Sequence, residues 1–229
     1  FQKNLQWIKE NQDHFIIFAV TALMSTLEKE NIVPDILVHV DGFEPSMRHI
    51  EKVSSMDFFK DTLLFFSSFT YPDFMKAFKQ ENIYMIQGVE NIKKDFISLS
   101  ASNVGLKGLA LALYLQAKEI YLLGLDLALD PESGATHIAD HAYAKKLDVD
   151  KKVELGEMID YKKTVFETEG NFRQTIPTTH YFYEAQREAS NIVLALKKDS
   201  THLYNLSDGA KIQDATASNR RVTGNRVFL

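Results

Sequence analysis

The chain has no cysteine among its 229 residues. Disulfides, thiolate metal ligands and cysteine nucleophiles are therefore excluded together, and the absence fits a reducing compartment. The chain also lacks an excess of positive charge, since its formal net charge is −5 and 25% of its residues are charged. A dedicated nucleic-acid binder normally presents a basic face, so we expect no nucleic-acid partner. Hydrophobic residues make up 45% of the chain, which is enough for a well-packed core.

Long apolar runs and several catalytic motifs are missing as well. The longest apolar stretches, His14–Met24 and Leu106–Leu115, are too short or too interrupted to span a bilayer. No signal peptide precedes the first element, so we expect a cytoplasmic protein without a membrane segment. The sequence contains no Walker-type phosphate loop, no GxGxxG fingerprint and no HExxH zinc motif.

Short apolar runs alternate with stretches of helical pattern in the first half of the chain. Four of these runs are Phe15–Val20, Ile36–Val40, Leu63–Phe66 and Ile120–Leu123. A run that is apolar throughout is typical of a parallel strand that is buried on both faces. The sequence therefore predicts an α/β fold in which these four strands share a single parallel sheet with helices on both faces.

The segment from Ser98 to Asp130 carries the most information about function. Small polar residues, among them Ser102 and Asn103, lead into a helix, and the strand that follows ends in Gly124 and Asp126. The N-terminus of a helix offers unpaired N–H groups that suit a phosphate. An acidic residue just past a strand can reach a ribose. The plain alternative is that Ser102 or Asn103 only caps the helix.

The pattern changes after Asp130. Residues 131–163 are rich in charge and poor in apolar periodicity, and we expect them to form a lid over the site. His137 and His141 are four residues apart, which would suit a metal on a helix. Pro131 and Gly134 favour a loop at the start of this segment, and we expect no metal site. Beyond the lid we expect a hairpin over 164–176, a helix over 178–198, a strand over 203–206 and a polar tail over 216–229.

The stretch SASNVGLKGLALALYLQAKEIYLLGLDLAL, followed by GATH, is similar to the core motif of the motility accessory factor (Maf) family, which carries the DUF115 domain. The segments Asp13–Ala22 and Ile32–Asp41 resemble the first strands of that family, and LYNLSDGAKI resembles its closing segment. The likeness covers most of residues 1–215, for which we predict a single domain. The core also resembles that of bacterial sialyltransferases that use CMP-sialic acid. The sequence departs from the family at Ala101–Ser102, where a pair of glycines is common.

The resemblance implies a Rossmann-like three-layer sandwich and a glycosyltransferase activity. Such an enzyme would transfer a nonulosonic acid of the pseudaminic, legionaminic or sialic type from a CMP-sugar to Ser or Thr of flagellin, as flagellar assembly and motility need. It would require no cofactor besides the donor, and its oligomeric state is left open. An archaeal branch of the superfamily suggests an alternative, a 6-hydroxymethylpterin pyrophosphokinase that uses ATP and Mg²⁺. A non-catalytic module that binds nucleotide or flagellin is the third possibility.

Transfer from a CMP-sugar needs a base for the acceptor hydroxyl and a site for the departing phosphate. His137, which follows the strand end by a short loop, is the expected base, and His141 is the second candidate. Ser102 and Asn103 are expected to hold phosphate or ribose. The remaining predicted nucleotide contacts are Asp41, Gly42, Gly124, Asp126 and Thr136. For the two aspartates, turn formation or capping is the alternative role.

Overall fold

The computed structural model describes residues 4–88, 93–96, 98–136, 145–150, 158, 160–219 and, for the backbone only, 227–228. The chain divides into two compact units, one of Phe1–Ile120 with Arg221–Leu229 and one of Tyr121–Arg220. The single domain over residues 1–215 stays a prediction.

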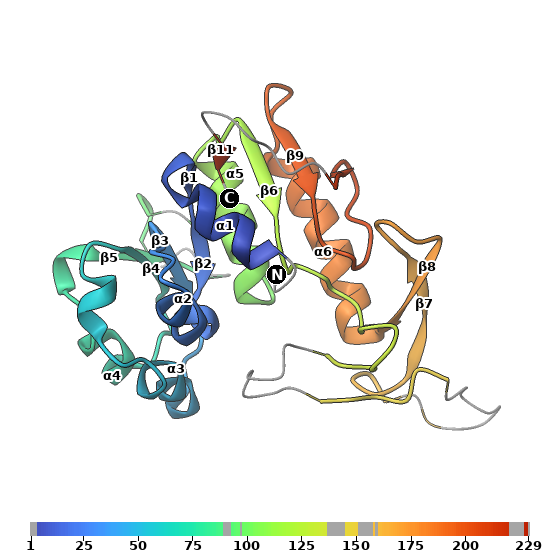
Figure 1. The fold of residues 1–229 in the computed structure, drawn as a ribbon, viewed down its shortest axis with the longest axis horizontal. Helices are drawn as coiled ribbons and strands as arrows, with labels where there is room; N and C mark the ends of the chain where they lie inside the picture. The colour runs from blue at the N-terminus through green and yellow to red at the C-terminus, as the bar shows by residue number, and fades with distance from the viewer. Residues whose placement is uncertain are drawn as a thin grey trace. The chain divides into compact units, whose positions relative to one another are not determined.

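The first unit is built on a four-stranded parallel sheet with the order β2-β3-β4-β5 (Figure 1). Its strands are β2 (Phe18–Val20), β3 (Ile36–His39), β4 (Leu63–Ser67) and β5 (Ile83–Ile86). The register places Val38 of β3 between Val20 of β2 and Phe65 of β4. Every residue of β3 is buried, as expected for a central strand covered on both faces.

Short helices precede and connect these strands, and one longer helix follows them. In chain order they are α1 (Leu5–Asn11), η2 (Gln12–His14), η3 (Thr21–Leu23), α2 (Met24–Glu30), η4 (Glu44–Met47), α3 (Arg48–Glu51), η5 (Met56–Phe59), α4 (Pro72–Lys76), η6 (Gln80–Asn82) and α5 (Val104–Tyr114). The helix α5 packs on β2 and β3. It buries apolar side chains on most of its circumference, because the sequence from Leu106 to Leu113 is almost entirely apolar.

The apolar run Phe15–Val20 is not one strand. It is divided at Ile17 into β1 (Phe15–Ile16) and β2. The N–H of Ile17 donates to the Asp35 carboxylate at 2.7 Å, and the Ile17 carbonyl accepts from the N–H groups of Asp35 and Ile36. These bonds occupy the backbone of Ile17, so the two halves of the run pair with different partners.

The strand β1 pairs in parallel with β11 (Val227–Phe228), and β11 pairs with β6 (Glu119–Leu122) at Ile120. The expectation that all four apolar runs share one sheet is therefore wrong, since β6 lies in a different sheet from β2, β3 and β4. The predicted α/β class with a mainly parallel sheet is confirmed.

The second unit contains an antiparallel hairpin and a long helix (Figure 1). The hairpin pairs β7 (Val165–Glu169) with β8 (Thr175–Thr179), and α6 (His180–Leu196) follows at once, with Thr179 as its N-cap. The sequence predicts both elements, and the structure confirms them with slightly different bounds. The predicted strand near residue 203 is β9 (His202–Asn205). The segment expected to be a tail contributes β10 (Thr216–Ala217), which pairs in parallel with β9.

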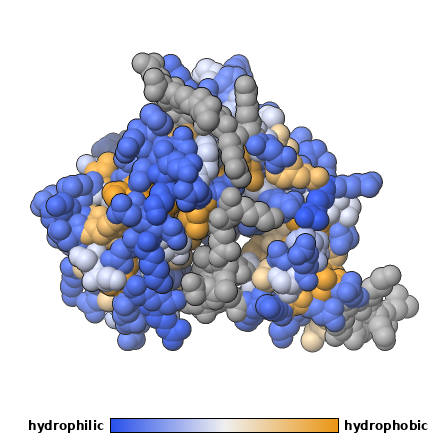
Figure 2. All heavy atoms as spheres, viewed as in Figure 1, coloured by the Kyte–Doolittle hydropathy of each residue, from blue (hydrophilic) through white to orange (hydrophobic). Residues whose placement is uncertain are grey.

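No helix within the described ranges is long and apolar enough to cross a bilayer. Hydrophilic residues cover most of the face shown in Figure 2, and hydrophobic residues form smaller areas between them. The most exposed aromatic side chains of the described residues are Phe43 and Phe69, both in the first unit.

Candidate functional site

The carboxyl edge of the first unit's parallel sheet gathers the loops that follow its strands. Asp41 and Gly42 come after β3, Phe69 comes after β4, and Gly88 comes after β5. The N–H of Tyr71 donates to the Asp41 carbonyl at 3.1 Å, which joins the first two loops. In an open α/β sheet this edge is where ligands bind. It is therefore the candidate site of this unit.

The helix α5 follows β5 in the chain and packs on β2 and β3 of the same sheet. The side-chain oxygen of Asn103 accepts the N–H of Leu106 at 3.0 Å, so Asn103 is the N-cap. Ser102 just before it is exposed. One turn into the helix, Lys107 is only 3% exposed, although lysine is rarely buried so deeply. The sequence signal for Lys107 is a single charge within the apolar run 106–113, and our reading of the motif missed it.

The loop after β3 needs glycine at position 42. A Cβ there would lie 2.5 Å from the carbonyl oxygen of Phe69, which is closer than real Cβ contacts. The neighbouring side chain of Asp41 is exposed. The backbone of this loop is thus held tightly while the Asp41 carboxylate stays accessible to a ligand.

The side chain of a buried histidine, His39, contacts the backbone of the same loop. His39 is 1% exposed and stacks on Phe74 with ring centroids 3.9 Å apart. Its Nε2 lies 3.1 Å from the Asp41 carbonyl, and its Nδ1 lies 2.7 Å from Thr21 Oγ1. Because a carbonyl only accepts, Nε2 carries the proton and Nδ1 accepts from the threonine hydroxyl. Burial lowers the pKa of His39 from 6.5 to about 4, against the opposing effect of the Asp41 carboxylate.

Stability should depend on pH through this imidazole. Above pH 6.5 it is neutral in both the folded and the unfolded chain. As the pH falls from 6.5 to about 4, His39 becomes protonated in the unfolded chain but stays neutral in the folded chain. The free energy of unfolding should drop across that window by about 3 kcal/mol. Urea denaturation at several pH values measures the drop, and His39→Gln should remove most of it. An equal pH dependence in both proteins would contradict the assignment.

Two of the predicted nucleotide contacts, Gly124 and Asp126, follow β6 in the second unit. The segment from Leu206 to Ala210 runs beside them. The N–H of Gly124 donates to Ser207 Oγ at 2.9 Å, and the N–H of Ala210 donates to the Asp126 carbonyl at 2.7 Å. Gly124 has a φ of 76°, which favours glycine. Both residues are exposed, so their backbone is fixed while the Asp126 side chain faces solvent.

The remaining predicted contact, Thr136, is also in the second unit. Its N–H and hydroxyl both lie within hydrogen-bond distance of the Lys145 carbonyl, at 2.9 and 3.2 Å. Its hydroxyl oxygen also accepts the N–H of Lys145 at 3.0 Å. The backbone of Thr136 is thus hydrogen-bonded to Lys145, near the start of the proposed lid.

Asp41 and Gly42 follow β3 at the carboxyl edge of the parallel sheet, and Ser102 and Asn103 precede α5, which packs on β2 and β3. Their grouping in one nucleotide site stays a prediction. The predicted bases His137 and His141 lie outside the described residues. Within the described part of the chain, no group of three or more His, Asp or Glu side chains is placed to hold a metal ion.

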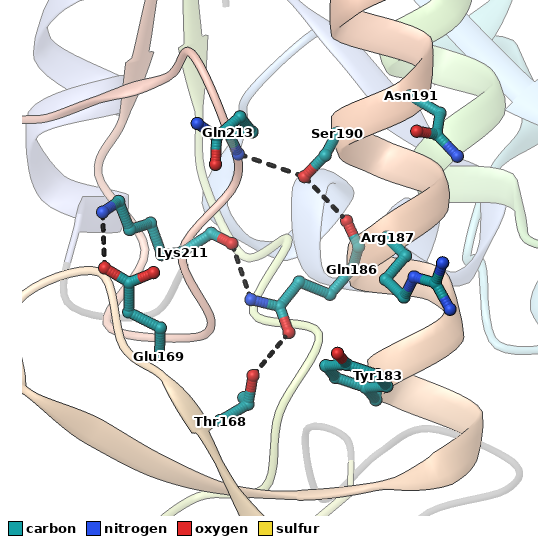
Figure 3. Close-up of a pocket in the computed structure, with 9 residues that line it drawn as sticks. All are labelled: Thr168, Glu169, Tyr183, Gln186, Arg187, Ser190, Asn191, Lys211 and Gln213. Atoms are coloured by element: carbon teal, nitrogen blue, oxygen red, sulfur yellow. Dashed lines mark hydrogen bonds and ion pairs between the residues drawn. The ribbon is translucent and has the colours of Figure 1, made fainter.

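A polar hollow in the second unit was not expected from the sequence (Figure 3). It has a volume of about 360 Å³ and lies between α6, the end of β7 and the segment after Ala210. Two hydrogen bonds hold the Gln186 side-chain amide, which lines the hollow. Its Oε1 accepts from the Thr168 hydroxyl, and its Nε2 donates to the Lys211 carbonyl. Its α6 side consists of the polar face of an amphipathic helix, which sequence reasoning assigns to solvent. The lining residues are Thr168, Glu169, Tyr183, Gln186, Arg187, Ser190, Asn191, Lys211 and Gln213.

Comparisons with known proteins bear on the first unit and on the fold. Residues 1–132 match the family described as 6-hydroxymethylpterin diphosphokinase MptE-like. Among solved structures, the chain is similar to the Maf glycosyltransferase from Magnetospirillum magneticum AMB-1, with a TM-score of 0.73 and 18% sequence identity. That likeness covers 95% of this chain and 32% of the solved one, so the chain spans about a third of that protein. Comparison with curated proteins gives no match.

Proposed function

Because the chain belongs to the 6-hydroxymethylpterin diphosphokinase MptE-like family, we propose that it forms the donor-binding part of a transferase with a nucleotide-activated substrate. The transferase would move a nonulosonic acid from CMP to serine or threonine hydroxyls of flagellin. The observation that carries this proposal is the fold, which matches a Maf glycosyltransferase over 95% of the chain. The sequence likeness to the Maf family over residues 100–137 supports the same choice of donor.

The carboxyl edge of the first unit is the proposed donor site. The first N–H groups of a helix have no partner within the helix. In α5, the N–H of Leu106 donates to the side chain of the N-cap residue Asn103. The N–H groups of Val104 and Gly105 would bind the CMP phosphate, aided by the positive end of the helix dipole. The exposed Asp41 carboxylate would accept from the ribose hydroxyls. Gly124, Asp126 and Thr136 of the second unit stay proposed nucleotide contacts.

The reaction follows from the chemistry of the donor. The acceptor oxygen attacks the anomeric carbon, and the bond from that carbon to the phosphate oxygen breaks. CMP leaves with the bonding electron pair, and its phosphate charge is stabilised at the start of α5. The proton of the acceptor hydroxyl passes to a base, for which we propose His137, with His141 as the second candidate. The segment 131–163 would close over the donor and exclude water, which would otherwise hydrolyse it.

The second candidate function is pyrophosphate transfer from ATP to 6-hydroxymethylpterin. The description of the matching family favours it, and it would require Mg²⁺ on the ATP phosphates. The two functions differ in the ligand that they need. Calorimetric titration with CMP, and separately with ATP and Mg²⁺, distinguishes them directly.

Replacing Asn103 with aspartate tests the phosphate site. Aspartate caps a helix as well as asparagine does, and its charge favours the helix dipole, so the thermal stability of the chain should be kept. The new charge should repel the CMP phosphate and weaken CMP binding about tenfold. Calorimetry on Asn103→Asp and on the wild-type chain measures the difference.

Thr179→Asp, at the N-cap of α6, is the matched control. It adds the same charge to a helix start to which we assign no phosphate. Because Thr179 is only 1% exposed, the thermal stability of this variant is measured alongside, and the folded variant should keep the wild-type CMP affinity. Equal CMP affinity in Asn103→Asp and the wild-type chain would remove α5 from the donor site.

A further inference from the structure

Two large aromatic side chains are exposed at the carboxyl edge of the first unit. Phe43 is 76% exposed and Phe69 is 65% exposed. Other exposed aromatic side chains of this unit are less accessible or lie on another ring; Tyr84, for example, stacks on Phe65 at 5.3 Å. Leaving most of a phenylalanine side chain in water forgoes the stabilisation that burial provides. Two such rings at a ligand-binding edge therefore call for an explanation other than packing.

Backbone contacts hold the two phenylalanines in neighbouring loops. Phe43 directly follows Gly42, and a Cβ at Gly42 would lie 3.8 Å from the Phe69 Cβ. The Phe69 ring passes close to Gly88, where a Cβ would lie 3.2 Å from its Cε2 atom. Gly88 thus leaves room for the Phe69 ring and Gly42 for the Phe69 backbone, and the Tyr71–Asp41 hydrogen bond joins the two loops. The loops that carry the two rings are thus fixed by backbone contacts, although the rings are not buried.

The position of these rings relative to Asp41 suits a nucleotide. Asp41 follows β3 and lies two residues before Phe43, and Phe69 follows the next strand of the sheet, β4. The helix start at Asn103 and the Asp41 carboxylate provide groups for phosphate and ribose. A ligand held by both has its base at the far end from the phosphate, toward the loops after β3 and β4.

We propose that Phe43 and Phe69 form an aromatic platform on which the planar heteroaromatic ring of the donor nucleotide stacks. This inference rests on the proposed function for its choice of cytosine. The shared chemistry, a flat nitrogen heterocycle, also describes the adenine of ATP and a pterin. Stacking on an aromatic side chain tolerates all of these rings, because each has a π face. Asp41 is exposed two residues before Phe43 and can accept from ribose hydroxyls, which favours a nucleotide as the occupant of the platform.

The test compares Phe69→Leu and Phe43→Leu with the wild-type chain in calorimetric titrations with CMP. Leucine keeps an apolar side chain and removes the π face, so loss of affinity reports stacking. Each variant should bind CMP about 5- to 20-fold more weakly. Phe69→Trp should keep the affinity and should show saturable quenching of its fluorescence by CMP. The wild-type chain has one tryptophan, the buried Trp7, and supplies the background signal.

Tyr114→Leu is the matched control, since Tyr114 is 46% exposed at the opposite end of α5. It should bind CMP like the wild-type chain. Equal CMP affinity in both phenylalanine variants, with Asn103→Asp still weakened, would overturn the platform and leave the proposed function standing. Binding of ATP or 6-hydroxymethylpterin instead of CMP, with the same loss in Phe69→Leu, would keep the platform and overturn the choice of donor. Binding of none of the three probes would overturn both.

Discussion

Replacing Gly209 with alanine should unfold the second unit or leave it severely destabilised. Gly209 lies against the backbone of Asp126, and an added Cβ would be 2.6 Å from the Asp126 carbonyl carbon and closer still to the Asp126 carbonyl oxygen. These are backbone atoms, which cannot turn away as a flexible side chain would. Separating the two segments would break the bond from the Ala210 N–H to the Asp126 carbonyl. We expect a loss of about 3 kcal/mol or more in the free energy of unfolding.

Gly108→Ala is the control for this substitution. Gly108 lies within α5, and a Cβ there would meet nothing within 4 Å. Alanine is the better helix former, so this variant should gain about 0.5–1 kcal/mol. Chemical denaturation followed by circular dichroism measures both. A Gly209→Ala protein with the wild-type midpoint would show that Leu206–Ala210 does not hold Asp126 as described.

Replacing His137 with alanine should abolish most of the transfer reaction. A positioned base contributes about 10²- to 10⁴-fold to the rate, and we expect a loss of that order in the rate of sugar transfer. CMP affinity should stay near the wild-type value, because a base acts on the acceptor proton in the transition state and not on the bound nucleotide. The initial rate with flagellin and a CMP-nonulosonate measures the first effect, and calorimetry measures the second.

His141→Ala is the companion variant and should keep most of the activity. Full activity in His137→Ala together with a large loss in His141→Ala would transfer the role of base to His141. A loss of CMP binding in His137→Ala would instead make this histidine part of the donor site.

Much of the fold can be predicted from the sequence because its strongest signals are local. Continuous apolar runs identify β3 and β4, and the amphipathic pattern before Lys198 identifies α6. The cap of α5 was also predictable, since Ser102 and Asn103 precede the apolar helix. The break at Ile17 was not, because it depends on a hydrogen bond from the carboxylate of Asp35, 18 residues away.

The candidate site was predicted only in part, because some of its features depend on contacts between residues far apart in the sequence. Asp41, Gly42 and Asn103 follow or precede elements that the sequence marks clearly. Phe43 and Phe69 look like ordinary core residues in the sequence, and only their exposure in the structure distinguishes them. The need for glycine at position 209 depends on a backbone 83 residues earlier in the chain. Such long-range contacts leave no periodic signal that a single sequence could reveal.

The most direct test of the account is mass spectrometry of flagellin after incubation with the full-length protein and a CMP-nonulosonate. We expect the mass of flagellin to increase by whole nonulosonic acid residues, on peptides with serine or threonine, as CMP is released in equal amount. The same incubation with ATP, Mg²⁺ and 6-hydroxymethylpterin should form no pterin diphosphate. Unmodified flagellin together with formation of AMP and pterin diphosphate would contradict the account.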